Sequence, residues 1–146
     1  PEQLLQIGDK ATAAVGLAVT RIDGFVSLDG TKGAPNSDTS IQDKQLGLSE
    51  MVTRAFKFSG TKLNINVKTA LQQWGAEAPE MRVEILTPNH SYITGYEFND
   101  SDPITSSGTQ VTASWNANPD LSKFAGNTVK LRFYFKNCKL YSFQFS

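Results

Sequence analysis

The chain has 146 residues, 39% of them hydrophobic, and its 14 basic and 14 acidic side chains give a formal net charge of zero. A chain of this length can bury about two thirds of its unfolded surface around one core, which argues against disorder. Neutral net charge provides no long-range field to gather nucleic acid or an anionic membrane, and no apolar run approaches the length of a membrane span.

Short runs of alternating apolar and polar residues recur along the chain, separated by clusters of Gly, Pro, Asn, Asp and Ser. This pattern is typical of an antiparallel all-β domain. It predicts strands over residues 14–20, 24–28, 51–58, 62–68, 81–86, 92–98, 110–115, 128–136 and 139–145, and one helical turn over 121–124. Two sheets packed face to face require strands with one apolar face, so we expect an antiparallel two-sheet β-sandwich.

Alternation also assigns side chains to the two faces of each strand, because successive side chains leave a strand on opposite sides. In residues 128–136 the row predicted to face the core is Val129, Leu131, Phe133 and Phe135, and the row predicted to face solvent is Lys130, Arg132, Tyr134 and Lys136. The same reasoning turns the following residues inward: Leu63, Ile65, Val67, Met81, Val83, Ile85, Val111, Ala113 and Trp115.

Two stretches are too long to be simple turns. Residues 29–49 are rich in Gly, Ser, Thr and Asp, and loops of this length are uncommon unless they are functional or mobile. We interpret them as a mobile insertion, with a lid over a site as the alternative. Residues 70–80 form the second stretch and contain Trp74.

The ends of the sequence and its cysteine content bear on domain organisation. Cys138 is the only cysteine, so neither an internal disulfide nor a cysteine-based metal or redox centre is expected. The chain begins Pro1-Glu2-Gln3, without a signal peptide or an initiator methionine. We therefore expect residues 1–146 to be a single β-sandwich domain excised from a longer multidomain protein.

Several short motifs follow one another in order from residue 21 to the end of the chain. They are Arg21-Ile22-Asp23-Gly24-Phe25-Val26-Ser27-Leu28, Thr53-Arg54-Ala55-Phe56-Lys57-Phe58-Ser59-Gly60, Arg82-Val83-Glu84-Ile85, Asp100-Ser101-Asp102-Pro103-Ile104, Trp115, Asp120-Leu121-Ser122, Ala125-Gly126 and Leu140-Tyr141-Ser142-Phe143-Gln144-Phe145. Through these motifs the chain resembles the C-terminal β-sandwich domain of bacterial carbohydrate-active proteins, which often follows a five-bladed propeller related to glycosidases. It departs from that pattern in the insertion at residues 31–49 and in the loop around Trp74.

The resemblance implies an all-β fold, an antiparallel two-sheet β-sandwich with a jelly-roll-like arrangement, in an extracellular or periplasmic protein. The resemblance supports the architecture more firmly than it supports a function or the identity of a ligand. We expect a noncatalytic carbohydrate-binding accessory module of a polysaccharide-degrading enzyme, which binds an algal or other extracellular glycan and tethers the attached catalytic domain to it. The domain is expected to be a monomer with no nucleic-acid or membrane partner.

Carbohydrate recognition needs aromatic rings that stack on sugars and planar polar groups that exchange hydrogen bonds with hydroxyls. The residues expected to bind ligand are Trp74, His90, Tyr92, Tyr96, Lys130, Arg132 and Tyr134. Trp74 is the first aromatic candidate, with a plug over one end of the sandwich as an equal alternative. The outward row at residues 130–134 suits sulfate or carboxylate groups of an acidic glycan, although a solvated strand face explains the same residues.

Catalysis is poorly supported by the sequence. His90 is the only histidine and lies in a turn-forming segment, so a Ser-His-Asp triad is not expected. No pair of carboxylates is singled out for glycoside hydrolysis. Asp100 and Asp102 could contribute to a structural calcium site, but an Asx turn before Pro103 is the preferred interpretation, and no cofactor is required. Two alternatives stay open: a structural sandwich that packs on a glycosidase propeller without binding ligand, and a small glycan-acting enzyme.

Overall fold

The structure, a computed structural model, describes residue 23 and residues 26–30, 48–69 and 78–146. Its elements are β1 (Leu28–Gly30), β2 (Ser49–Val52), β3 (Phe56–Lys57), β4 (Leu63–Thr69), β5 (Glu80–Leu86), β6 (Gly108–Thr112), the 3-10 helix η1 (Ser122–Phe124), β7 (Thr128–Lys136) and β8 (Cys138–Phe145). No helix in this part of the chain has the length and apolar character to cross a membrane. The strand predicted at residues 14–20 and the loop around Trp74 lie outside the described residues.

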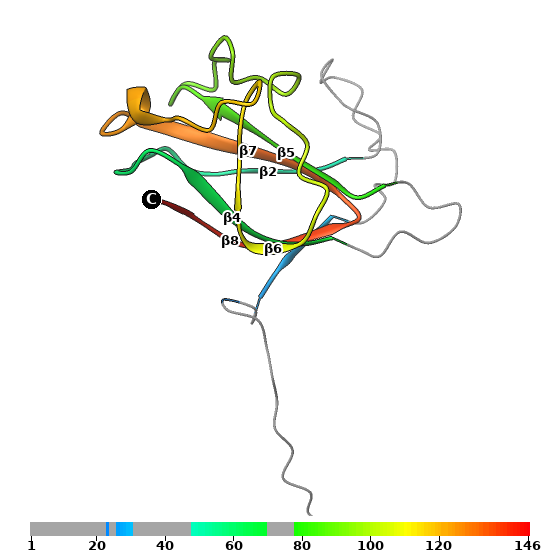
Figure 1. Cartoon of the computed structure of the whole chain (residues 1–146). Helices are drawn as coiled ribbons and strands as arrows, with labels where there is room; N and C mark the ends of the chain where they lie inside the picture. The colour runs from blue at the N-terminus through cyan, green and yellow to red at the C-terminus, as the bar shows by residue number, and fades with distance from the viewer. Residues whose placement is uncertain (1–22, 24–25, 31–47, 70–77) are drawn as a thin grey trace, which may run out of the picture.

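The strands form two antiparallel sheets that lie over each other as two layers (Figure 1). One sheet has the order β1-β8-β4-β6. In the other, β7 pairs with β2 and β3 along one edge and with β5 along its opposite edge. The predicted all-β, antiparallel two-sheet β-sandwich is therefore confirmed, and η1 confirms the predicted turn of helix.

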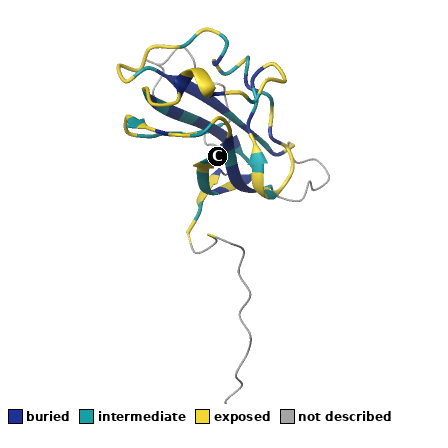
Figure 2. Cartoon of the chain, turned by 60° about the vertical axis from the view of Figure 1, so that its left-hand side comes forward, coloured by how far each residue is buried: buried dark blue, intermediate teal, exposed yellow. Residues whose placement is uncertain are grey.

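The core lies between the two sheets, where the inward rows predicted by alternation meet. The residues of the β7 row, Val129, Leu131, Phe133 and Phe135, are each at most 3% exposed. Figure 2 shows buried residues along the facing strands and exposed residues mainly in the connections. The Phe133 ring of β7 lies 5.2 Å from the Phe143 ring of β8, so aromatic packing joins the two layers. Trp115 is 2% exposed and donates a hydrogen bond from Nε1 to the carbonyl oxygen of Val83, as expected for a core residue.

The strand predicted at residues 92–98 is wrong, because this segment forms consecutive turns. Tyr96 N–H bonds to the Ile93 carbonyl at 2.9 Å, with Gly95 between them at φ 85°. Glycine reaches this conformation without steric cost, and a turn results where the apolar spacing alone favoured a strand. Only Tyr92 keeps a strand-like contact, an isolated antiparallel bridge to Leu86.

The strand predicted at residues 51–58 is divided into β2 and β3. Val52 is paired with Arg132 and Phe56 with Val129, so β2 and β3 have one more residue between these pairs than β7 has. Thr53 fills the irregularity, because its N–H donates to the Leu131 carbonyl and its Oγ1 accepts from the Leu131 N–H. Such a bulge bends the strand while its polar backbone groups stay bonded.

The last two strands belong to different sheets, although a single residue connects them. Asn137 has φ 49°, a left-handed conformation that asparagine tolerates, and it turns the chain from β7 in one layer to β8 in the other. Cys138, predicted in this turn, instead begins β8 and is 3% exposed. Burial raises the pKa of its thiol to about 12, so the thiolate needed for cysteine chemistry is disfavoured.

Candidate functional site

The outer surface of the β2–β7–β5 layer carries three of the residues predicted to bind ligand, Lys130, Arg132 and Tyr134. We call this surface the charged face. Its residues are Glu50 of β2, Glu80, Arg82 and Glu84 of β5, and Lys130, Arg132, Tyr134 and Lys136 of β7. Antiparallel pairing places Arg132 opposite Glu84 on one side and Tyr134 opposite Glu50 on the other, so residues far apart in sequence become neighbours.

Glu84 is at the centre of the charged face and is 3% exposed. Its Oε1 accepts a hydrogen bond from Phe98 N–H at 2.8 Å, and its Oε2 lies 3.3 Å from Arg132 Nη1 and 3.2 Å from the Tyr134 hydroxyl. Burial raises the pKa of Glu84, although these partners stabilise its charged form. Glu84 was not among the predicted site residues; its signals in the sequence were its place in the Arg82-Val83-Glu84-Ile85 motif and on the polar row of a predicted strand.

Most charges of this face are compensated within it. Arg132 Nε lies 3.3 Å from Glu50 Oε1, so one guanidinium contacts two carboxylates. Lys136 and Arg82 both contact Glu80, with Lys136 Nζ at 3.7 Å. An anionic group of a glycan would have to compete with these carboxylates for Arg82 and Arg132. We therefore interpret the ion pairs of the two arginines as structural and not as a binding site.

Part of the charged face is covered by the turns that follow β5. The Phe98 ring packs edge-on against the Tyr134 ring, with centroids 5.0 Å apart. Arg82 holds the same segment, because its Nη1 donates to the Ser101 carbonyl and its guanidinium lies over the Phe98 ring at 5.0 Å. Tyr134 faces outward as predicted but is only 6% exposed, and its ring is therefore closed to a ligand by Phe98.

An accessible corner of the charged face is formed by His90, Tyr92 and Lys130, which we call the Tyr92 corner. Tyr92 is 47% exposed, and the Arg132 guanidinium lies 5.9 Å from its ring centroid. His90 is exposed in a turn with φ 65°, and its two ring nitrogens lie 2.9 and 3.2 Å from Lys130 Nζ. The structure thus brings together residues from two separate segments that the sequence analysis had selected individually.

Tyr96, which was also predicted to bind ligand, does not join this corner. Tyr96 is 7% exposed, and its ring packs against Trp115 at 5.3 Å and against Phe124 at 4.9 Å between centroids. Its ring is therefore part of the core and presents no stacking surface to a sugar. Trp74 lies outside the described residues, so its role stays a prediction.

Asp100 and Asp102 lie in the turns after β5, where their carboxylates bond to the chain. Asp102 Oδ2 accepts hydrogen bonds from Ser114 Oγ at 2.6 Å and Ala117 N–H at 2.8 Å. Asp100 Oδ2 accepts from Glu97 N–H at 3.1 Å, and its Oδ1 accepts from Asn116 Nδ2 at 3.2 Å. Both side chains accept backbone hydrogens, as predicted, but not in an Asx turn: the N–H groups two residues on, those of Asp102 and Ile104, bond to the carbonyls of Ser114 and Met81. Within the described ranges, no group of three or more His, Cys, Asp or Glu residues is arranged to hold a metal ion.

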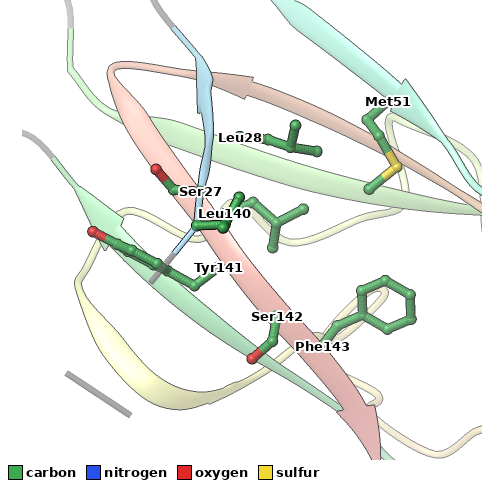
Figure 3. Close-up of a pocket in the computed structure, with 8 residues that line it drawn as sticks. Ser27, Leu28, Met51, Leu140, Tyr141, Ser142 and Phe143 are labelled. Atoms are coloured by element: carbon green, nitrogen blue, oxygen red, sulfur yellow. The ribbon is translucent and has the colours of Figure 1, made fainter. Parts of the chain in front are cut away.

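An apolar groove of about 360 Å³ is lined by residues of β1, β2 and β8 (Figure 3). Its apolar lining is formed by Val26, Leu28, Met51, Leu140 and Phe143. Among the described residues that line it there is no carboxylate, imidazole or amine to act as an acid or a base. The groove suits apolar contact, with Val26 76% exposed at its rim.

Comparison with known proteins gives no relative: no family model matches the chain, and neither a curated protein nor a solved structure matches it.

Proposed function

We propose that this domain is a noncatalytic carbohydrate-binding module of an extracellular or periplasmic polysaccharide-degrading enzyme. The observation that carries the proposal is the Tyr92 corner, where an exposed ring lies beside the Arg132 guanidinium and the His90 imidazole contacts the Lys130 ammonium group. Sugars are bound by this combination, because the apolar side of the ring stacks on an aromatic face and the hydroxyls exchange hydrogen bonds with polar groups.

Each residue of the corner has a definite task in this proposal. Tyr92 supplies the stacking surface, and the Arg132 guanidinium beneath it limits the orientations of its ring. Among the described residues Lys130 contacts an imidazole and not a carboxylate, so the ammonium group has further N–H donors for a hydroxyl, carboxylate or sulfate group of a glycan. Binding at one such corner is weak, and its benefit is to raise the concentration of substrate near an attached catalytic domain.

The test is affinity electrophoresis in gels that contain laminarin, galactomannan, alginate or carrageenan, the first two uncharged and the last two acidic. At least one polymer should retard the wild-type domain, and for at least one of the polymers that do, Tyr92→Ala should weaken the retardation about three- to tenfold. Tyr92→Phe keeps the ring and should retain binding. Lys130→Ala should weaken binding of an acidic polymer, whereas Lys68→Ala, which removes an exposed lysine from the other sheet, should not.

The same experiment includes Trp74→Ala, because the sequence independently predicts that Trp74 stacks on a sugar. Loss of retardation with an unchanged melting temperature would assign it to the glycan site, and loss of stability would assign it to the core. If no polymer retards the wild-type domain, the proposed function is wrong.

A second candidate function, a structural sandwich that packs against a neighbouring domain, is favoured by the apolar groove. Val26 and Leu28 at its rim are 76% and 47% exposed, and contiguous exposed apolar surface is typical of an interaction site. Replacing Val26 with Asp should release the neighbouring domain from contact in the parent protein, measured as increased protease cleavage between the two. Unchanged cleavage would count against this alternative.

A further inference from the structure

The outer surface of the β1–β8–β4–β6 sheet differs in chemistry from the charged face on the opposite layer. We call it the amide face. Its residues are Asn64 of β4, Gln110 and Thr112 of β6, and Tyr141, Ser142 and Gln144 of β8, while Asn66 of β4 lies on the same side but is only 3% exposed. Asn64 is paired with Thr112 on one side and with Gln144 on the other, so three uncharged hydrogen-bonding side chains lie in one row across three strands. Such a row spans about 10 Å, because neighbouring strands lie about 4.8 Å apart.

Two asparagines on one face of β4 are unexpected on local grounds. Asparagine is depleted in strands, and β4 is an internal strand between β8 and β6. Asn64 uses both ends of its amide, since Nδ2 donates to Ser146 Oγ at 2.9 Å and Oδ1 accepts from Thr112 Oγ1 at 2.8 Å. The amide therefore fixes the orientation of two hydroxyl groups on the surface. Departures from local preference of this kind are concentrated at functional sites.

An irregularity in β8 adds an aromatic ring to this face. Ser142 is paired with Asn66 and Leu140 with Val67, which leaves Tyr141 as an extra residue between the two pairs. Such a bulge changes the direction of side chains along a strand. Figure 3 shows Tyr141 and Ser142 leaving β8 on the side opposite to Phe143. Ser142 Oγ also donates to Asp23 Oδ2 at 3.2 Å, at the border of the face.

The charged side chains on the strands of this sheet lie at its ends, and the carboxylate of Asp23, which precedes β1, reaches Ser142. Lys139 Nζ of β8 lies 2.6 Å from Asp29 Oδ2 of β1. Lys68 of β4 is paired with Lys139 at the same end of the sheet. Across the centre, where Thr112 and Gln144 are exposed, the side chains are amides and hydroxyls. These groups both donate and accept, as sugar hydroxyls do, and they offer no charge to attract an acidic polymer.

From this arrangement we propose that the amide face is a second glycan-binding surface, specific for an uncharged polysaccharide. The inference rests on the proposed carbohydrate-binding function and adds a separate site with its own ligand class. Gln144, Thr112 and Asn64 bind hydroxyl groups along the chain, and the Tyr141 ring stacks on a sugar. The domain then has one binding surface on each outer side of the sandwich.

The experiment compares Gln144→Ala, Tyr141→Ala and Tyr92→Ala in gels that contain laminarin or galactomannan. The first two variants should each weaken retardation about three- to tenfold, and Tyr92→Ala should leave it unchanged. Gln144→Glu has nearly the same shape but loses the amide donors, and it should also weaken binding. Retardation by an uncharged polymer should persist from roughly 0.05 to 0.5 M NaCl, because no ion pair contributes. Melting temperatures identify any variant that loses stability instead of binding.

The outcomes separate this inference from the proposed function. If an uncharged polymer binds and only Tyr92→Ala weakens it, the amide face is not a glycan site while the carbohydrate-binding function stands. If only alginate or carrageenan binds, through Tyr92 and Lys130, the second site is likewise overturned. If the amide-face variants lose binding of an uncharged polymer and Tyr92→Ala does not, the inference is supported. The Tyr92 corner is wrong only if Tyr92→Ala also leaves retardation by alginate and carrageenan unchanged.

Discussion

The Tyr134 hydroxyl lies 3.2 Å from the Oε2 atom of Glu84 and donates a hydrogen bond to it, on a sheet surface where both residues are almost fully buried. Tyr134 is in turn covered by Phe98, whose N–H bonds to the other oxygen of Glu84. One carboxylate therefore connects β5, β7 and the turns that follow β5. The rigidity of the surface beside the Tyr92 corner depends on this connection.

Replacing Glu84 with Ala should be strongly destabilising. The substitution leaves Arg132 with Glu50 as its remaining carboxylate contact and leaves Phe98 N–H without its acceptor. Removal of one partner of a buried ion pair typically costs about 3–5 kcal/mol. Urea unfolding monitored by tryptophan fluorescence measures the loss. Glu84→Gln, which keeps the shape and most of the hydrogen bonds, should lose much less, and equal losses in both variants would contradict this account.

The same carboxylate predicts a pH dependence of stability. Burial raises the pKa of Glu84 above its ordinary value of 4.5, so the folded state binds the proton more tightly than the unfolded state. The stability that this group contributes is full below pH 4.5 and decreases as the pH rises through the pKa of the folded state. The difference in unfolding free energy between wild type and Glu84→Gln should therefore fall as the pH rises over that window. A difference that increases with pH would mean that the pKa of Glu84 is lowered by its partners.

Phe133→Ala should cost about 3–5 kcal/mol, the usual range for truncating a fully buried phenylalanine. Phe133 has no exposed surface, and its ring packs against Phe143 of the opposite layer. Phe133→Leu fills more of the space and should lose less. Denaturant unfolding gives both values; a loss below about 1 kcal/mol for the alanine variant would contradict the face assignment.

Gly30 in β1 has no room for a side chain. A β-carbon there would lie 2.7 Å from the Phe135 carbonyl oxygen, a backbone atom that cannot move independently of β7. Gly30→Ala should therefore destabilise the domain by about 1–3 kcal/mol, as overpacking does. Gly126→Ala is the control for replacing a glycine without a steric clash. Open space surrounds that position, and only its φ of 78° is unfavourable for alanine. A neutral Gly30→Ala would show that β1 separates from β7 without cost.

Strand alternation predicted the inward rows of β4, β5 and β7 correctly because each has an uninterrupted period of two. It failed at residues 92–98, where the turn at Gly95 and the contacts of Tyr96 with Trp115 and Phe124 outweigh local spacing. It also missed that Phe98 covers Tyr134, a contact between positions far apart in sequence. His90 and Lys130 were selected separately, but their proximity depends on the turn after β5, which no period in the sequence encodes.

Asp102 provides a test between a structural turn and a calcium ligand. Its Oδ2 accepts from Ser114 Oγ and Ala117 N–H, so Asp102→Ala should cost about 1–3 kcal/mol by removing both acceptor contacts. Asp102→Asn retains an oxygen that can accept both bonds and should lose less than half as much stability. Melting temperatures with calcium and with a chelator complete the experiment. A chelator-induced fall in wild type that is absent from Asp102→Asn would instead assign the carboxylate to an ion, because an amide oxygen is the weaker ligand for calcium.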